Sequence, residues 1–546
     1  MRKKEYVVTL KNKDDLPGFY NDMETVGGSL SIPNRAVPVK NRRPISRNTT
    51  YLLTEFEAKK ISKDPRVLSV ELTFEEQGIK IKPSRSETST LWNKSNTIST
   101  GHRNWGLLRC VEGATRSNWG SNGTTNVNGT ITLTSTGKHV DAVIVDGHFD
   151  PDHAEFAVNA DGTGGSRVVQ FNWLSLNPQV IGEPAGTYVY APYVGDTALT
   201  NNNNHGMAVA GVFAGNTRGW ASDANIYNIS PYASNPNTDV PFNLFDYIRA
   251  WHNSKPINPA TGRRNPTITN HSYGADADLP VTSISQVRFR GVVNNGPFTL
   301  SQLSAFGIVT YDSGGGVYAA TFPLRSSAFD ADIVDAIDDG IIIVSASGNS
   351  ATKIDNFSSN LSADYNNYIV SDGFLYYYNR GPLFATPGSI QVGAIAATVS
   401  ETKATYSNCG PRIDLYAPGS LIMTTINSGG FVSDARDPID RWTKVNGTSF
   451  SSPQVAGALA CLAEQWPTMT QSQALRYITE NATVDQIADT EGGPGDDLSL
   501  QGSENRYLYY VKERQEQGQI TPRSNQGFRP TSGMTWPRPR IYRYGR

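Results

Sequence analysis

The chain of 546 residues has 48 lysines and arginines against 50 aspartates and glutamates, and its formal charge of -2 offers no electrostatic footprint for nucleic acid or an anionic membrane. No apolar run approaches the roughly 18 residues of a membrane-spanning helix. The few, widely spaced cysteines fit neither a disulfide framework nor a metal cluster, so we expect reduced thiols at Cys110, Cys409 and Cys461. The basic N-terminus lacks the apolar core of a signal peptide, which favours a cytoplasmic or virion-associated protein over a classically secreted one.

The stretch 1–75 has the pattern of a small separate unit. The runs EYVVTL and RVLSVEL predict its first and last strands, and two helical patterns lie between them with room for two middle strands. Thr54 and Glu57 have the spacing of a capping box at the start of the second helix. Residues 76–103 are polar and without sustained periodicity, which predicts a linker.

Short continuous apolar runs mark residues 104–485 as an α/β domain. The runs DAVIVD, ANIYNI, TITNHS and GIIIVSASG alternate with helical or glycine-rich segments, as expected for strands of a parallel sheet that helices cover on both faces. Long inserts at 275–325 and 355–385 are expected to form surface loops or small hairpins. Residues 486–546 are predicted to be a C-terminal extension with an Arg/Pro/aromatic tail, which docks to a larger assembly or stays disordered.

Four polar residues stand where chemistry is expected in such a sheet. Asp146 and Asn349 each follow an apolar strand, and functional groups gather beyond the carboxyl ends of parallel strands. His205 begins a helix of small residues, and Ser449 stands at the start of another, beside unpaired backbone N–H groups and the positive end of the helix dipole. Taken singly, each residue has an ordinary alternative as a turn or capping residue.

Together the four residues supply an acyl-transfer site. A serine hydroxyl needs a neutral imidazole to take its proton, and the imidazole needs a carboxylate to hold its tautomer. An amide N–H aimed at the developing oxyanion completes the set. The chain order aspartate, histidine, serine is that of subtilisin and differs from the orders in chymotrypsin and the α/β-hydrolases.

The motifs around these residues resemble those of the subtilisin-like serine proteases, the subtilases, over roughly residues 104–480. The matching motifs are AVIVDGHFDPDHAEF, HGMAVAG, SASGN and NGTSFSSPQVAG. The resemblance implies a three-layer subtilisin-like domain with a central parallel sheet and a serine endopeptidase acting on polypeptide substrates. It makes Asp146, His205 and Ser449 the catalytic residues and Asn349 the oxyanion donor. The implied substrate-binding residues are Ser272, Tyr273, Gly274, Ser347 and Gly348.

The N-terminal unit resembles the inhibitor-like propeptide that precedes many subtilases, on the stretch LTEFEAKKISKDPRVLSVEL. This implies a small ferredoxin-like α+β domain that acts as chaperone and intramolecular inhibitor of a self-processed zymogen. We expect the cut between Phe74 and Asn104. The alternative is a ferredoxin-like domain that stays permanently attached.

The sequence departs from the family pattern at Gly147, Met207, Ala208 and Gln454, so the support of Asp146 and His205 is expected to differ. The small residues at the pocket positions, Gly274, Ser347, Gly348 and Ser350, predict a roomy pocket for apolar or aromatic side chains.

A local alternative is a metal site in DGHFDPDH, which crowds imidazoles and carboxylates together. With the other motifs present we expect no required cofactor and no metal at the catalytic site. Glu155 matches a position where many subtilases place a calcium-binding carboxylate, which makes calcium possible.

The alternative from another functional class is a structural or virion-associated docking protein that retains a subtilase fold. The long inserts, the tail and the missing signal peptide motivate it. The complete catalytic set favours the enzyme, because a protein without activity has no physical need for four dispersed polar residues of this kind.

Overall fold

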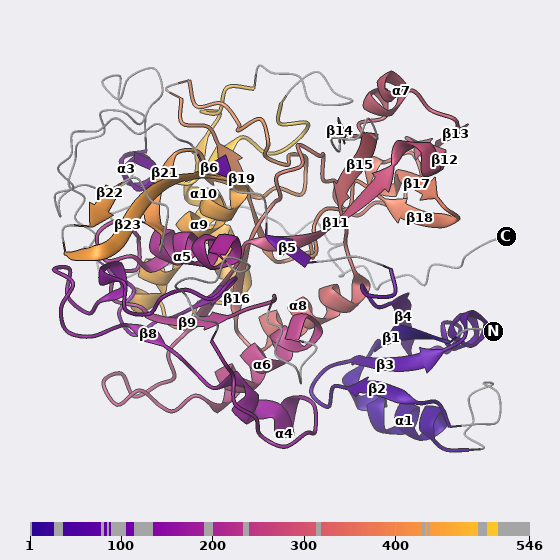
Figure 1. Ribbon diagram of the computed structural model, residues 1–546, viewed down its shortest axis with the longest axis horizontal. Helices are drawn as coiled ribbons and strands as arrows, with labels where there is room; N and C mark the ends of the chain where they lie inside the picture. Colours follow the sequence, from indigo (N-terminus) through magenta and orange to yellow (C-terminus); the bar gives the residue numbers. More distant parts are fainter. Residues whose placement is uncertain are drawn as a thin grey trace, which may run out of the picture. The chain divides into compact units, whose positions relative to one another are not determined.

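The computed structural model describes the residues 3–26, 36–77, 81–83, 87–88, 105–113, 135–190, 200–232, 240–312, 318–398, 400–426, 432–434, 436–489 and 499–510 (Figure 1). The chain divides into two compact units. The smaller one contains Met1–Gly78 together with Asn177–Pro184, and the larger one contains Ile79–Leu176 and Ala185–Tyr510. No helix of the described residues is long and apolar enough to cross a membrane.

The smaller unit is an antiparallel sheet with two helices, as predicted. Its strand order is β2-β3-β1-β4, and the capping box of Thr54 and Glu57 opens α2. Its core includes Phe19, Met23 and Tyr51. The elements are β1 (Lys4–Leu10), α1 (Leu16–Glu24), β2 (Val39–Arg42), β3 (Asn48–Leu53), α2 (Glu55–Ile61) and β4 (Val67–Leu72). The ferredoxin-like α+β arrangement expected for residues 1–75 is therefore confirmed.

The larger unit is built on a nine-stranded sheet in the order β24-β25-β20-β19-β16-β10-β7-β9-β8. All its neighbouring strands pair in parallel except β24 and β25. Its strands are β7 (Asp141–Val145), β8 (Val168–Val169), β9 (Asn225–Ile229), β10 (Thr267–His271), β16 (Ile342–Ala346), β19 (Ile390–Ile395), β20 (Leu415–Pro418), β24 (Thr483–Val484) and β25 (Arg506–Tyr507). The four apolar runs of the sequence form β7, β9, β10 and β16, which confirms the α/β class with a central parallel sheet.

Helices cover both faces of this sheet. Successive side chains of a strand point to opposite faces, so neighbouring residues of β10 show which helix lies on each side. On β10, His271 stacks on Phe245 of α6 (Val240–Ser254), with ring centroids 5.2 Å apart. Asn270 faces the other way and donates to Ser272, whose hydroxyl contacts Ser452 of α9 (Thr448–Gln465). The helices α5 (Thr200–Ala214) and α9 pack together on that side, and α6 packs with α8 (Ser327–Asp338). The sheet therefore lies between two layers of helices, which is the three-layer arrangement expected from the sequence.

The long inserts form small antiparallel sheets of their own. One has the order β14-β15-β11-β5 and the other β13-β12-β17-β18, and they share a core that includes Val287, Phe322 and Ile369. The strands of these two sheets are β5 (Ile81–Pro83), β11 (Tyr273–Pro280), β12 (Ile284–Phe289), β13 (Val292–Asn295), β14 (Thr310–Asp312), β15 (Tyr318–Pro323), β17 (Tyr368–Ser371) and β18 (Phe374–Tyr377); α7 (Leu300–Ala305) lies within the same insert. The edge strand β11 therefore continues directly from β10 into a larger structure than a surface loop.

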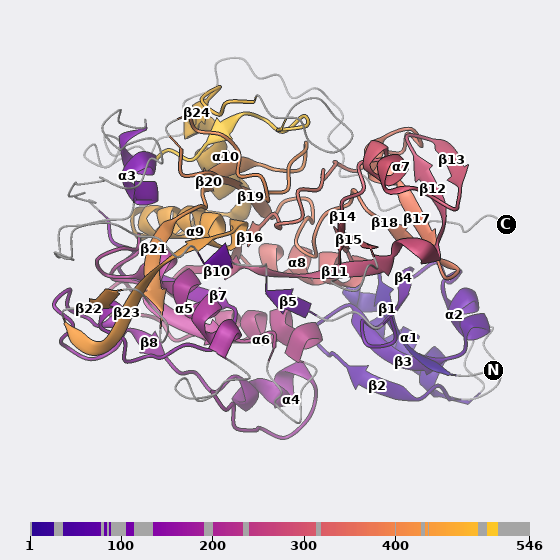
Figure 2. The same cartoon turned by 45° about the horizontal axis from the view of Figure 1, so that its top comes forward.

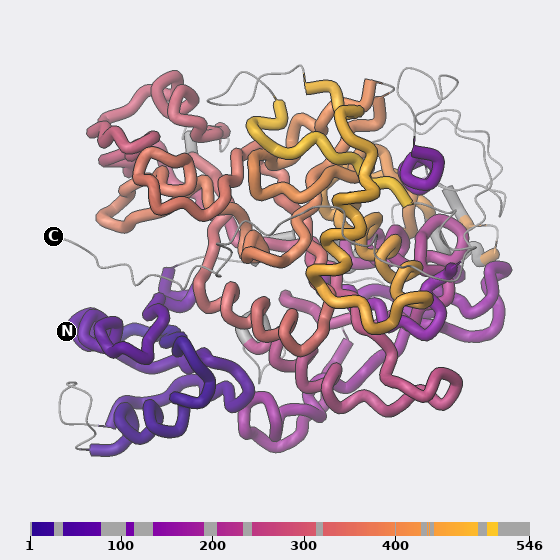
Figure 3. The backbone as a smooth tube through the Cα atoms, turned by 180° about the vertical axis from the view of Figure 1, so that it is seen from behind, coloured from indigo at the N-terminus to yellow at the C-terminus, as the bar shows by residue number. Residues whose placement is uncertain are grey.

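A further sheet combines β21 (Ile422–Ile426), β22 (Val432–Asp434) and β23 (Asp437–Asn446) with the short strand β6 (Glu87–Thr88). The main sheet continues beyond residue 485, where β25 pairs with β20, and the last described residues run back into the body of this unit (Figure 3). Arg109 of α3 (Trp105–Glu112) is fully buried there. It bonds Glu401 and lies over the ring of Tyr507 at 3.9 Å. The tail from residue 511 lies outside the described residues.

Buried arginines hold the loop that follows β7. Glu155, in a short 3-10 helix (Ala154–Phe156), accepts from Arg436 Nη2 at 2.6 Å and from the backbone N–H groups of Thr217 and Arg218 at 2.8 and 2.6 Å. Arg436 also bonds Asp434, and its guanidinium lowers the pKa of that carboxyl although burial opposes the shift. Both oxygens of Glu155 are thus used within the chain.

The carbonyl oxygens of the same loop are also taken. Arg167, whose pKa burial lowers to about 10, donates to the main-chain oxygens of Glu155, Ala157, Ala214 and Ala224. Calcium needs about six to eight oxygen ligands, and no group of three or more His, Cys, Asp or Glu residues suited to a metal occurs in the part of the chain that the structure describes. We propose that the residues around Glu155 hold no calcium ion, because guanidinium groups already supply positive charge there.

We therefore predict that chelation leaves the fold unaffected, whereas loss of Arg436 destabilises it. In a Ser449→Ala background, excess EDTA should not lower Tm. Arg436→Met should lower the free energy of unfolding by about 3–5 kcal/mol, since it leaves the Glu155 charge buried without its cation. Arg476→Met, which removes an exposed partner of Glu480, is the control and should change Tm little. A clear fall of Tm in EDTA, reversed by calcium, would contradict this account.

Candidate active site

Asp146 and His205 form a buried pair at the carboxyl end of the sheet. Asp146 directly follows β7, and His205 lies in the N-terminal half of α5. His205 Nδ1 is 2.9 Å from both carboxylate oxygens of Asp146, and the backbone N–H of Gly147 donates to Oδ1 at 2.7 Å. A carboxylate only accepts, so Nδ1 donates to Asp146, and in the neutral imidazole with this tautomer Nε2 is the acceptor.

Close backbone contact holds the histidine helix in place. A Cβ at Gly206 would lie 2.1 Å from the carbonyl oxygen of Gly147, so only glycine lets α5 approach the loop after Asp146. The hydroxyls of Thr424 and Thr425 on β21 donate to the carbonyl oxygens of Ala208 and Met207 at 2.7 and 2.9 Å. Positions 207 and 208, where the sequence departs from the family pattern, are therefore supported through their main chain.

Ser449 lies at the first turn of α9, which begins after Gly447 with a φ of 147°. Its side chain is fully buried, and its Oγ is 3.5 Å from the carbonyl oxygen of Ser272. Ser272 Oγ in turn donates to the main-chain oxygen of Ser449 at 3.0 Å. The backbone N–H of Ser449 is one of those at a helix start that have no intrahelical acceptor.

His205 Nε2 is buried and makes no hydrogen bond within the described part of the chain. The imidazole packs against Phe450, with ring centroids 5.5 Å apart, next to Ser449 in sequence. Burying an unpaired nitrogen costs free energy. The Ser449 hydroxyl is directed to the carbonyl oxygen of Ser272, so it does not bond His205 Nε2 in this structure.

Asn349 is oriented by the residue that precedes Ser449. Its Oδ1 accepts from both the backbone N–H and the hydroxyl of Thr448, at 2.9 and 2.8 Å. Because the oxygen faces a backbone donor, the amide Nδ2 is directed to the other side, as a donor. Gly348, with a φ of 98°, brings its N–H to 3.2 Å from the same threonine hydroxyl. The end of β16 and the start of α9 are thereby joined through one side chain.

The neighbouring groups are neutral or engaged elsewhere. Burial, reinforced by the Asp146 charge, raises the pKa of Tyr232 and of Tyr273, so these phenols stay protonated. Burial lowers the pKa of His148 to about 4, and its Nε2 contacts the hydroxyl of Tyr188 at 2.9 Å. His153 accepts from the backbone of Glu155. The two imidazoles of the DGHFDPDH stretch thus make separate local contacts.

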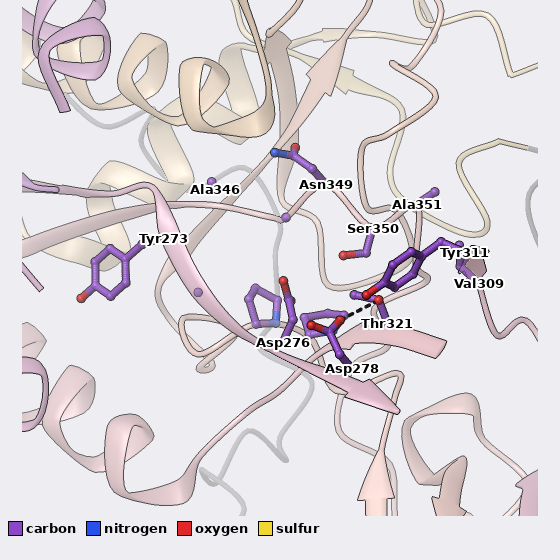
Figure 4. Close-up of a pocket in the computed structure, with 14 residues that line it drawn as sticks. Tyr273, Asp276, Asp278, Val309, Tyr311, Thr321, Ala346, Asn349, Ser350 and Ala351 are labelled. Carbon is purple, nitrogen blue, oxygen red and sulfur yellow. Dashed lines mark hydrogen bonds between the residues drawn. The ribbon is translucent and has the colours of Figure 1, made fainter. Parts of the chain in front are cut away.

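A pocket of about 260 Å³ opens beside Asn349 (Figure 4). Three of the predicted substrate-binding residues line it: Tyr273, Gly274 and Gly348. Ser272 and Ser347 are fully buried, and Ser272 acts instead by holding α9. The other lining residues are Asp276, Asp278, Val309, Tyr311, Thr321, Pro323, Ala346, Asn349, Ser350, Ala351 and Pro382.

The lining also includes two carboxylates, Asp276 and Asp278, beside the small residues from which the sequence predicts a pocket for apolar or aromatic side chains. Gly274, Asp276 and Asp278 alternate along β11 and so share one face of the strand. The alternation in YGADADLP is the sequence signal for this face, because it is typical of an extended strand. The expectation of a surface insert at 275–325 does not use it.

Comparisons with known proteins agree with this geometry. Residues 137–509 match the model of the Subtilase family. An extracellular protease of Xanthomonas campestris pv. campestris is 38% identical over 103 residues, which are 19% of this chain and 17% of that protein. Subtilisin DY of Bacillus licheniformis is 27% identical over 161 residues, 30% of this chain and 46% of that protein.

The matched stretches span less than half of the length of either relative. Among solved structures, fervidolysin from Fervidobacterium pennivorans is 16% identical, with a TM-score of 0.47, covering 92% of this chain and 60% of that one. The family model covers more than half of the chain and includes all four residues described above, from Asp146 to Ser449. The chain therefore belongs to the subtilase family.

Proposed function

We propose that this protein is a serine endopeptidase that hydrolyses peptide bonds through Asp146, His205 and Ser449. The observation that carries the proposal is the buried Asp146–His205 hydrogen bond, with His205 Nε2 unpaired within the described chain near the helix that bears Ser449. A docking protein would have no use for this costly arrangement. The comparisons support the peptidase as the family's chemistry.

In the proposed mechanism, Ser449 Oγ attacks the carbonyl carbon of the scissile bond and passes its proton to His205 Nε2. The Asp146 carboxylate stabilises the imidazolium that forms. Asn349 Nδ2 and the Ser449 backbone N–H donate to the oxyanion of the tetrahedral intermediate. When the C–N bond breaks, the imidazolium gives its proton to the leaving amine. A water molecule then attacks the acyl-enzyme and passes a proton to His205 Nε2. The ester bond breaks, and Ser449 Oγ takes the proton back from the imidazolium.

A fluorophosphonate probe tests the nucleophile directly. The wild-type protein should be labelled at one site, Ser449→Ala should not be labelled, and Ser451→Ala should be labelled like the wild type. Ser451 is the control because it lies in the same buried helical turn. Absence of labelling in the wild type, even after proteolytic removal of the N-terminal unit, would leave the docking protein as the better account.

Replacing the oxyanion donor should slow the chemical step. We expect Asn349→Leu to lower kcat by roughly 10² to 10³ with little change in KM, since the interaction forms mainly in the transition state. Asn356→Leu, an exposed asparagine in the following loop, is the control and should leave both constants unchanged. Steady-state kinetics on a fluorogenic peptide measure both, and a change confined to KM would refute the role of Asn349.

We further propose that the N-terminal region is an intramolecular inhibitor that the enzyme removes itself. Within the larger unit, β5 lies antiparallel along β11, with Pro83 opposite Tyr273 and Lys82 opposite Gly274 (Figure 2). The next described strand, β6, pairs Glu87 with Asn446, shortly before Ser449. Strand addition to an exposed edge is a general mode of binding extended peptides. Substrate segments therefore have a place on β11 that β5 occupies.

These two pairings narrow the expected cut from the whole stretch between Phe74 and Asn104 to the bonds between Pro83 and Glu87. Wild-type protein should give a fragment of about 9 kDa, at roughly 110 Da per residue, and a new N-terminus between Ser84 and Glu87. Ser449→Ala should remain whole. A denaturing gel and N-terminal sequencing provide the measurement, because the fragments can stay associated after the cut. A wild type that hydrolyses peptides as a single chain would show that the N-terminal unit is a permanent domain.

A further inference from the structure

The pocket beside Asn349 lies where the substrate residue that precedes the scissile bond must place its side chain. Its walls include Gly274 of the edge strand and Gly348 and Asn349 of the loop after β16. In the proposed mechanism Asn349 binds the oxygen of the carbonyl under attack. The side chain of that same residue therefore starts next to Asn349 and enters the adjacent pocket.

The pocket is large enough for a long side chain. One water molecule, with a single heavy atom, takes up about 30 Å³ in the liquid. The volume of the pocket, about 260 Å³, is several times larger, so it can hold the row of heavy atoms in a lysine or arginine side chain. Val309, Pro323 and Pro382 supply apolar wall against which an aliphatic stem can pack.

The polar wall of the pocket is acidic. The carboxylates of Asp276 and Asp278 and the hydroxyls of Ser350 and Tyr311 point toward the same space (Figure 4). Thr321 on β15 donates to Asp278 Oδ1 at 2.8 Å, which fixes that carboxylate from the neighbouring strand. The described residues that line the pocket include two aspartates and no lysine, arginine or histidine.

We propose that this pocket selects substrates with lysine or arginine immediately before the scissile bond, and that Asp276 and Asp278 are the specificity-determining residues. The inference rests on the proposed peptidase function. A basic side chain brings a positive charge that the two carboxylates attract, whereas an aromatic or aliphatic side chain offers them neither charge nor a hydrogen-bond donor. An acidic side chain would be repelled. This replaces the expectation of an apolar pocket drawn from its small residues.

The test compares processed wild type with Asp276→Asn, Asp278→Asn and the double variant, on fluorogenic peptides that differ only in the residue before the scissile bond. Lysine or arginine should be preferred over phenylalanine and leucine by at least about tenfold in kcat/KM in the wild type. Each single variant should reduce this preference, and the double variant should abolish it. Asp312→Asn, on the adjacent strand β14 and outside the pocket lining, is the control and should keep the wild-type preference.

Labelling by the fluorophosphonate probe separates the two proposals and shows whether each variant is folded. If the variants are labelled at the wild-type rate but the wild type prefers phenylalanine or leucine, the pocket assignment is overturned and the peptidase stands. If the preference for lysine or arginine persists unchanged in the double variant, the specificity lies elsewhere and the assignment is again overturned. If the wild type is not labelled at all, the peptidase proposal itself falls.

Discussion

The hydrogen bond between Asp146 and His205 is the contact on which the rest of the site depends. It requires a carboxylate at the end of β7 and an imidazole in the N-terminal half of α5 to meet in the buried interior. That meeting is possible because Gly206 lets the helix touch the loop after Asp146, and because threonines of β21 hold the helix from its other side. Any side chain at position 206 would force these elements apart.

The serine end of the site depends on a second junction, between the end of β16 and the start of α9. Thr448 uses its backbone N–H and its hydroxyl on Asn349, while Ser272 supports Ser449 from the edge strand. Ser449, Asn349 and the start of β11 are thus joined through hydrogen bonds. Such direct connection limits their relative motion, which the mechanism we propose requires.

The strand β11 connects recognition with inhibition in our proposals. Its first residues pair with β5, and residues further along the same strand line the pocket beside Asn349. The insert that follows is anchored to it, since β15 pairs with β11 and Thr321 holds Asp278. One extended strand therefore provides the main-chain surface for a bound segment and the side chains that face its neighbouring pocket.

Buried guanidinium groups satisfy polar groups at several junctions of the larger unit. Arg436 and Arg167 satisfy the carboxylate and carbonyl oxygens around Glu155, and Arg109 joins α3 to Glu401 and Tyr507. These guanidinium groups are more weakly hydrated than an ammonium and present several donors in a fixed plane, which suits them to buried polar junctions. Their partners are far away in the chain, so no local pattern indicated them.

The sequence by itself determined the fold class and where the chemistry is to be sought. The apolar runs of β7, β9, β10 and β16 are local signals of buried parallel strands, and the capping box of α2 depends on residues three apart. The positions of Asp146 and Ser449 could be read in the same way, because each stands at the end or start of an element, whereas His205, expected to begin its helix, lies in the second turn of α5. Only the tertiary structure decided which distant groups meet: Arg436 on Glu155, Thr448 on Asn349, and Asp276 and Asp278 on the pocket. The residues in these contacts are far apart in the sequence, and no local pattern links them. They meet only once the sheet and its inserts have been assembled.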